Sequence, residues 1–160
     1  MKIGQGFDMH QLVDGRKLVL GGVTIPFEKG LEGYSDGDAL LHAVIDAVLG
    51  ALSLGDIGTH FPPGEPRWKD VSSVLLLKEV VNMMRGEGYA LSNLDSTIMA
   101  DEPVMSPWIG GMRDEIAAVF GVVKNRVSVK AKSLEGLSAI LPHAVIAASA
   151  VVSLKACGAD

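Results

Sequence analysis

Three residues in the N-terminal third of the chain have side chains that could bind a metal ion. Asp8 and His10 lie two positions apart in the segment GFDMHQLV. On a β-strand, side chains two apart point to the same face, so this pair would lie side by side while Met9 turns into the core. His42 follows in an apolar segment with helical spacing. One Asp and two His are a typical catalytic zinc set, because three protein ligands leave the fourth tetrahedral position open.

The helix expected around His42 also carries acidic side chains. Asp38 and Asp46 lie four residues before and after His42, on the same helical stripe. Either carboxylate could orient the second nitrogen of the imidazole. Spacing alone leaves metal binding open, because an Asp-x-His pair is frequent by chance and a helical histidine is more often an ordinary surface or core residue.

Composition narrows the class of protein. The chain has 160 residues, 48% of them apolar and only 5% aromatic, which favours a folded domain with an aliphatic core. A net charge of −5 without a basic run argues against nucleic-acid binding. A single cysteine, Cys157, excludes an internal disulfide and favours the reducing cytoplasm. The apolar run 144–154 is too short to span a bilayer, so we expect a buried strand or helix there and no membrane association.

The order of the remaining patterns predicts an α+β fold. Apolar residues with helical periodicity predict three helices. The first begins from Asp38, the second runs from about Ser73 to Arg85, and the third has Ser106 as its N-cap and Pro107 as its first helical residue. Strand patterns occupy 91–100 and 126–133, and the Gly-Gly pair within 17–27 predicts a hairpin. We therefore expect one domain over residues 1–160, an α/β sandwich with helices on one face of a mixed four-stranded sheet and a small N-terminal β-hairpin.

Five blocks of sequence closely resemble the 2-C-methyl-D-erythritol 2,4-cyclodiphosphate synthase family. They are IGQGFDMH (3–10), GGVTIPFEKGLEGYSDGDALLHAVIDAVLGAL (21–52), LGDIGTHFP (54–62), TIMADEP (97–103) and VSVKAKSLEGL (127–137). The combination of SDGDALLHA and LGDIG behind an FDxH strand is specific, and the likeness covers roughly residues 1 to 137.

The resemblance implies a homotrimer with active sites between neighbouring subunits, in the non-mevalonate isoprenoid pathway. The implied reaction converts 4-diphosphocytidyl-2-C-methyl-D-erythritol 2-phosphate to the 2,4-cyclodiphosphate and CMP. The 2-phosphate attacks the β-phosphorus of the same molecule, so the enzyme is a phosphorus-oxygen lyase. Such chemistry needs positioning and charge neutralisation, which bound metal ions can supply.

The resemblance also assigns site residues. Zinc would be bound by Asp8, His10 and His42, and Mg²⁺ or Mn²⁺ by Glu135. Tyr34 and Ser133 occupy the two positions with transition-state roles. The cytidine pocket would be lined by 100–106 and 131–133. Substrate contacts are implied for Asp8, His10, Ser35, Asp56, Ile57, Gly58, Phe61, Ala100, Met105, Lys132, Ser133 and Glu135.

Without the resemblance, several of these residues have simpler interpretations. Asp56 and Gly58 could shape a turn after the helix, and Ser35 could be a cap. Glu135 alone is an ordinary surface acid, and Met105 is more often core than nucleotide contact.

The chain departs from the family pattern at 34, 132–134 and 138–144. Tyr34 stands where a histidine is usual, and KSLE (132–135) replaces a Thr-Thr-Thr-Glu run. Lys132 adds a positive charge near the expected phosphates. The usual glycine-rich segment with a phosphate-binding arginine is replaced by SAILPHA, in which His143 lies one position from the missing arginine. These changes leave an alternative, a non-catalytic or repurposed zinc-binding trimer that binds another phosphorylated metabolite. A zinc hydrolase is a third possibility, but it lacks an obvious general base.

Overall fold

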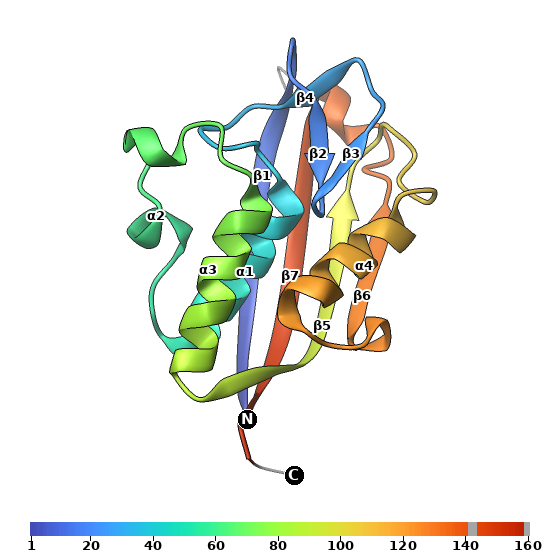
Figure 1. The fold of residues 1–160 in the computed structure, drawn as a ribbon. Coiled ribbons are helices and arrows are strands. Elements are labelled where there is room, and N and C mark those ends of the chain that lie inside the picture. Colours follow the sequence, from blue (N-terminus) through green and yellow to red (C-terminus); the bar gives the residue numbers. More distant parts are fainter. Residues whose placement is uncertain (141–143, 159–160) are drawn as a thin grey trace.

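The computed structural model describes residues 1–140 and 144–158 and has a mixed five-stranded sheet as its centre (Figure 1). The strand order is β4-β1-β7-β5-β6. The strands are β1 (Lys2–Asp14), β4 (Lys29–Leu31), β5 (Tyr89–Met99), β6 (Val127–Lys132) and β7 (Val145–Ala156). Among these five strands, only β5 and β6 pair in parallel. The α+β prediction is confirmed, and the extra strand is β4, which pairs with the last residues of β1.

The predicted hairpin is present as β2 (Leu18–Leu20) and β3 (Val23–Ile25). Gly21 and Gly22 join the two strands, and both have positive φ angles, 60° and 76°. This left-handed conformation at both turn positions is that of the tight turns that suit a two-residue hairpin. The segment 144–154, which the sequence leaves as strand or helix, is the central strand β7.

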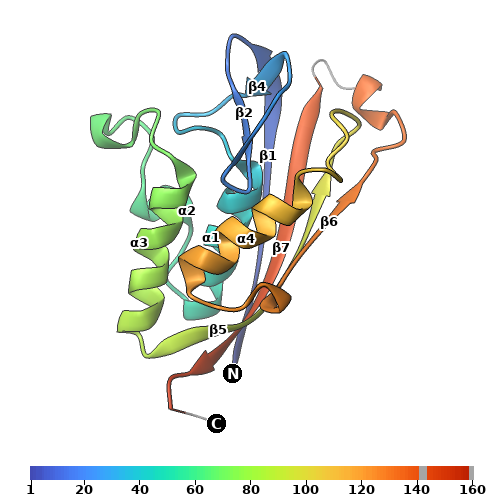
Figure 2. The same cartoon turned by 45° about the vertical axis from the view of Figure 1, so that its right-hand side comes forward.

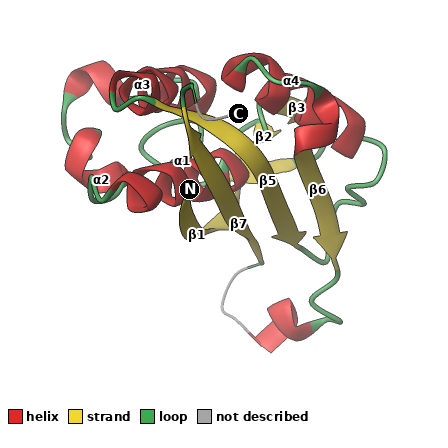
Figure 3. Ribbon diagram, turned by 90° about the horizontal axis from the view of Figure 1, so that it is seen from below, coloured by secondary structure: helices red, strands yellow, loops and turns green. Residues whose placement is uncertain are grey.

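Helices cover one face of the sheet (Figures 2 and 3). They are α1 (Ala39–Leu52), α2 (Ile57–His60), α3 (Ser73–Gly86) and α4 (Ile109–Phe120), with short 3-10 turns at Pro66–Trp68, Lys124–Arg126 and Leu137–Ile140. Helix α1 packs on β1 and β7, α4 packs next to β6, and α3 lies against α1. No helix within the described ranges is both long and apolar enough to cross a membrane.

The start of α4 differs from the sequence prediction. Ser106 and Pro107 lie in a turn, and the helix begins at Ile109, two residues after the expected Pro107, with Trp108 at the N-cap and no side-chain cap. The backbone N–H of Trp108 donates to the carbonyl of Met105 at 2.9 Å, which closes the turn. The Ser-Pro pair therefore marks the turn before the helix rather than its first residue.

The two faces of β1 are also the reverse of the simple expectation. Gly4, Gly6 and Leu12 are buried against the helices, whereas Met9 is 52% and Phe7 is 53% exposed on the opposite face. The prediction that Met9 turns into the core is therefore wrong. Asp8 and His10 share the helix-covered face with the glycines, since they have the same parity along the strand.

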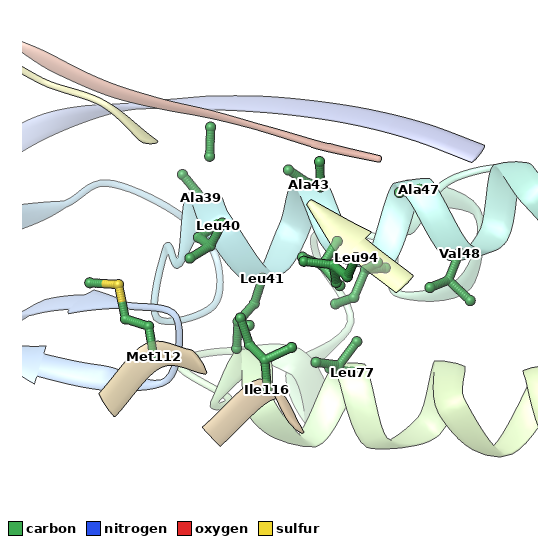
Figure 4. Packing of buried hydrophobic residues seen from close by; sticks show 14 of the residues in the cluster. Ala39, Leu40, Leu41, Ala43, Ala47, Val48, Leu77, Leu94, Met112 and Ile116 are labelled. Atoms are coloured by element: carbon green, nitrogen blue, oxygen red, sulfur yellow. The ribbon is translucent and has the colours of Figure 1, made fainter. Parts of the chain in front are cut away.

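The glycines on β1 allow α1 to approach the strand closely. A Cβ atom at Gly4 would lie 1.9 Å from the carbonyl oxygen of Ala47, and one at Gly6 would lie 2.0 Å from that of Ala43. The facing side of α1 is a row of alanines, Ala39, Ala43 and Ala47, which point toward the strands in Figure 4, while Leu41 and Val48 point toward the other helices. Backbone therefore packs on backbone along this contact.

Replacing Gly6 by alanine should push α1 away from β1. We expect Gly6→Ala to lower the free energy of unfolding by about 2–3 kcal/mol, because the clash is with helix backbone and not with a flexible side chain. Gly50→Ala is the matched control, since Gly50 lies in α1 with its nearest contact at 3.9 Å, and it should raise the free energy of unfolding by about 0.5–1 kcal/mol. Urea unfolding measures both; equal effects would contradict the close-packing interpretation.

Candidate metal centre and substrate pocket

Three predicted ligand atoms from two elements meet beside the start of α1. Asp8 Oδ2 lies 2.7 Å from His10 Nε2 and 2.9 Å from His42 Nδ1, and the two histidine nitrogens are 3.1 Å apart. Asp8 and His10 come from β1, and His42 comes from the first turn of α1. Among the described residues, this is the one cluster of three or more His, Cys, Asp or Glu with ligand atoms this close.

The cluster fits a tetrahedral divalent metal ion. Zinc binds nitrogen and oxygen ligands at about 2.0–2.1 Å, which puts the ligand atoms of a tetrahedral site about 3.3 Å from one another. The three observed separations lie a few tenths of an ångström below that value. The Asp-His-His set is one that holds catalytic zinc and leaves a position for another ligand.

Asp8 and His10 shift each other's pKa in opposite directions. Burial alone raises the pKa of Asp8, but the hydrogen bonds and charges of His10 and His42 lower that pKa well below its usual range. Burial lowers the pKa of His10, and the hydrogen bond and charge of Asp8 outweigh this effect and raise it. An ionised carboxylate is therefore maintained next to two imidazoles, which favours a cation at their centre.

The second nitrogen of His42 faces two hydroxyl groups instead of a carboxylate. His42 Nε2 lies 2.9 Å from Ser73 Oγ and 3.2 Å from Ser35 Oγ. Ser73 is the first residue of α3 and is fully buried. The expectation that Asp38 or Asp46 orients this nitrogen is therefore wrong.

The two aspartates of α1 bind backbone amides. Asp38 is fully buried and accepts from the N–H groups of Gly21, Gly22 and Leu41 at 2.7–3.0 Å, so it caps α1 and attaches the hairpin to it. Burial raises the pKa of Asp38, although the backbone hydrogen bonds oppose this. Asp46 accepts from Ile57 N at 2.8 Å and thereby fixes the start of α2.

The ligand cluster opens into a pocket of about 200 Å³. Most predicted residues for the methylerythritol phosphate end of the substrate line it. The lining residues are Asp8, His10, Tyr34, Ser35, His42, Ile57, Gly58, Phe61, Pro63, Trp68 and Leu76.

Asp56 is the one member of this predicted group outside the lining. Its carboxylate accepts from the backbone and the hydroxyl of Thr59, both at 2.8 Å, and these bonds lower its pKa. Asp56 therefore caps α2, as its simpler interpretation expects, and lies next to Ile57 and Gly58 of the pocket wall.

The predicted cytidine residues lie at the carboxyl ends of the parallel strands β5 and β6. Ala100 N donates to Lys132 O at 3.0 Å, and Met105 is 4% exposed. Lys132 and Ser133 are exposed at the end of β6. The crevice beyond the carboxyl ends of parallel strands is a common ligand-binding position.

One carboxylate joins the two loops at this edge. Asp101 Oδ1 accepts from Ser133 Oγ at 3.2 Å, from Leu134 N at 3.0 Å and from Gly136 N at 3.2 Å. Ser133 Oγ also accepts from Glu135 N at 2.8 Å. The loop after β5 and the loop after β6 therefore form one connected unit.

Within one chain, this second group is separate from the pocket. None of the residues Ala100, Met105, Lys132, Ser133 and Glu135 lines it. Two strands, β7 and β5, lie between β1 and β6, which corresponds to about 14 Å at the usual strand spacing. Glu135 is exposed and is not part of the Asp8 cluster. Pro142, at the position of the missing arginine, and His143 beside it lie outside the described residues.

Four residues around the pocket were not expected from the sequence. Three of them complete the wall: Pro63, Trp68 and Leu76. Trp68 contacts Phe61 edge to face at 5.1 Å between ring centroids. Ser73 reaches His42 across 31 positions of sequence. A serine at a helix start predicts only a cap, so its local pattern contains no signal of this contact.

Comparisons with known proteins identify the family to which this sequence and fold are similar. The chain matches the model of the YgbB family over residues 1–155. It is 56% identical over 154 residues to the 2-C-methyl-D-erythritol 2,4-cyclodiphosphate synthase of Moorella thermoacetica, covering 96% of this chain and 94% of that protein. The synthase of Gloeobacter violaceus is 50% identical, with 97% and 95% covered. A solved synthase structure with CDP bound has a TM-score of 0.88 at 35% identity, covering 96% of this chain and all of that one.

Metal binding at the cluster can be measured directly. We expect the purified protein to bind one Zn²⁺ per chain in competition with a chelator, and His42→Ala to weaken binding by more than about 100-fold, since a direct ligand should matter more than an outer-shell partner. His60→Ala is the control, because His60 is bonded to Leu54 O at 2.8 Å and lies outside the cluster. Equal affinities for the two variants would exclude His42 as a ligand.

Proposed function

The chain belongs to the YgbB family of 2-C-methyl-D-erythritol 2,4-cyclodiphosphate synthases, and we propose that it carries out their reaction. It converts 4-diphosphocytidyl-2-C-methyl-D-erythritol 2-phosphate to the 2,4-cyclodiphosphate and CMP, as a phosphorus-oxygen lyase of isoprenoid biosynthesis. The family match over residues 1–155 supports the prediction of a single domain over residues 1–160. The single, exposed free thiol of Cys157 supports a cytoplasmic location.

The observation that carries this proposal is the coincidence of the ligand cluster with the pocket. Asp8, His10 and His42 line the same cavity as Ser35, Gly58 and Phe61. A polyanionic substrate needs cationic charge at one end and a shaped, partly apolar wall at the other. The cavity of about 200 Å³ is smaller than the about 300–1,000 Å³ of sites that enclose a drug-sized ligand, so it takes one end of the substrate.

The reaction requires alignment more than covalent participation by the protein. An oxygen of the 2-phosphate forms a bond to the β-phosphorus, the bond from that phosphorus to the oxygen bridging to the α-phosphate breaks, and CMP leaves with the electron pair. In-line phosphoryl transfer depends mainly on positioning and on stabilising charge at the phosphoryl oxygens. Residues that orient both phosphates in one molecule therefore supply most of the catalysis.

Bound metal ions would supply positive charge that neutralises the phosphates. Zinc would be held by Asp8, His10 and His42, and Mg²⁺ or Mn²⁺ by Glu135, whose carboxylate suits a hard cation that also binds phosphate oxygens. Glu135 is exposed, so its carboxylate is accessible to a metal ion that binds together with the substrate.

The remaining residues divide between the two ends of the substrate. Ser35, Asp56, Ile57, Gly58 and Phe61 would bind the methylerythritol phosphate end. Ala100 and Met105 would bind the cytidine. Tyr34 would donate its hydroxyl hydrogen to a phosphate oxygen during the transfer. Ser133 would exchange its hydrogen bond to Asp101 for one to a phosphate oxygen, and Lys132 would add charge there.

We further propose a homotrimer that uses the open face of the sheet. The helices lie on the other face (Figure 3), while Ile3, Phe7, Met9 and Val151 are 46–63% exposed. Phe7 pairs with Ser149, Met9 with Ala147, and Val151 with Gln5, so these side chains share one surface. A group of apolar side chains across neighbouring strands is typical of a protein interface.

A neighbouring copy would also complete the active site. The pocket lies on the β1 side of the sheet and the cytidine residues lie at β6, the opposite edge of the same chain. Around a closed trimer, the β6 edge of one subunit can meet the β4-β1 side of the next. The substrate would then bind across this boundary.

A CMP-release assay tests the activity. With Zn²⁺ and Mg²⁺, the wild type should release CMP from the diphosphocytidyl substrate, and His42→Ala should abolish release. Lys132→Ala should lower kcat/KM about 30-fold, on the order of 2 kcal/mol for one charge-assisted phosphate contact. Lys130→Ala is the matched control, since its ammonium pairs with Asp95. A zinc-binding trimer that releases no CMP would instead support the repurposed binder of another phosphorylated metabolite.

Oligomeric state provides a separate test. The wild type should sediment as a trimer, and Phe7→Glu should yield monomer, because three carboxylates would be buried without partners. Leu75→Glu changes a side chain of similar exposure, 52% against 53%, on α3 and should leave the trimer intact. A monomeric wild type, or a trimeric Phe7→Glu, would refute the sheet-face interface.

A further inference from the structure

The far side of the His42 imidazole is held by a pair of residues from outside α1. Ser73 Oγ lies 2.9 Å from His42 Nε2 and donates its own hydrogen to Asp36 Oδ1 at 2.5 Å. Ser73 is fully buried at the start of α3. Asp36 lies in the loop before α1, so the contact joins three segments of the chain.

The hydrogen count decides the direction of these bonds. A serine hydroxyl has one hydrogen, and that of Ser73 is directed to the Asp36 carboxylate. Ser73 Oγ can then only accept a hydrogen bond from the imidazole, so His42 carries its proton on Nε2. Nδ1 faces Asp8 and His10, and when a metal ion is bound its lone pair is the one directed to that ion.

Asp36 fixes Ser73 through both oxygens. Its Oδ2 accepts from the backbone N–H of Ser73 at 3.0 Å, while its Oδ1 accepts from the hydroxyl. The N–H of Asp36 itself donates to Val71 O at 3.1 Å. Asp36 therefore binds both the backbone and the hydroxyl of Ser73, which restricts rotation of the hydroxyl away from His42.

We propose that Asp36 and Ser73 are positioning residues that orient His42 and raise the metal affinity of the Asp8-His10-His42 cluster. This inference rests on the metal site of the proposed function and adds the outer hydrogen-bond pair to it. A carboxylate bonded to the hydroxyl strengthens that oxygen as an acceptor, which in turn makes the imidazole a better ligand.

Ser35 is the competing acceptor and is distinguishable. Its Oγ lies farther from Nε2, at 3.2 Å, and already accepts from Gly37 N at 3.3 Å. Ser35 also lines the pocket, whereas Ser73 does not. Ser73 is therefore assigned to the orientation of His42, and Ser35 remains available to a ligand.

Zinc affinity measured by chelator competition tests the inference. Ser73→Ala keeps the backbone N–H that binds Asp36 and removes only the hydroxyl, and we expect Zn²⁺ to bind about 10- to 100-fold more weakly. Asp36→Asn retains the size and one acceptor oxygen of the side chain and should cause a smaller loss, which carries the test if Ser73→Ala does not fold. Ser72→Ala is the matched control, because Ser72 caps the same helix through Val74 N without touching His42. It should lower the melting temperature and leave zinc affinity unchanged.

A spectroscopic readout separates orientation from stability. In the zinc-loaded wild type, the His42 Nε2–H should give a slowly exchanging NMR signal, and this signal should be lost in Ser73→Ala and retained in Ser72→Ala. Wild-type affinity and a retained signal in Ser73→Ala would overturn the inference while leaving the metal site intact. Failure of the wild type to bind zinc would instead refute the metal site itself.

Discussion

The close packing of α1 on β1 is the constraint on which the site depends. Two elements far apart in sequence must approach until Asp8 and His10 on one reach His42 on the other. Gly4 and Gly6 provide that distance, because any side chain there would overlap the helix backbone. The alanine row on α1 completes a contact without large side chains. The small residues of β1 and α1 therefore bring the metal ligands together.

Features set by local periodicity could be predicted from the sequence, whereas contacts between elements could not. The pairing of Asp8 with His10 follows from the two-residue period of a strand, and the helices around His42 and at 73–85 follow from apolar periodicity. The inward placement of Met9 was wrong because it assumed that the apolar side of a strand faces the core. Here, glycines face the helix and apolar residues face outward. The approach of His42 to β1 required the family resemblance, since periodicity gives no distances between elements.

Outer contacts were less predictable than ligands. Asp38 and Asp46 have the correct helical spacing to reach His42, but backbone amides compete for both carboxylates. Ser73 comes from another helix, and Asp36 reaches it through a loop. The prediction of where α4 starts was wrong for a related reason, because a Ser-Pro pair suits both a helix start and the turn before a helix. Local pattern identifies which groups are available for hydrogen bonding, and tertiary packing decides their partners.

The single carboxylate of Asp101 has a consequence for ligand recognition. It accepts three hydrogen bonds from the segment that follows β6 and so binds two loops into one body. When two flexible loops become ordered on binding a ligand, each loses conformational entropy, and this loss weakens affinity. Here much of that ordering is already present in the folded chain. A nucleotide would bind to two loops that are already fixed to each other, and a change that loosens one loop should also loosen the other.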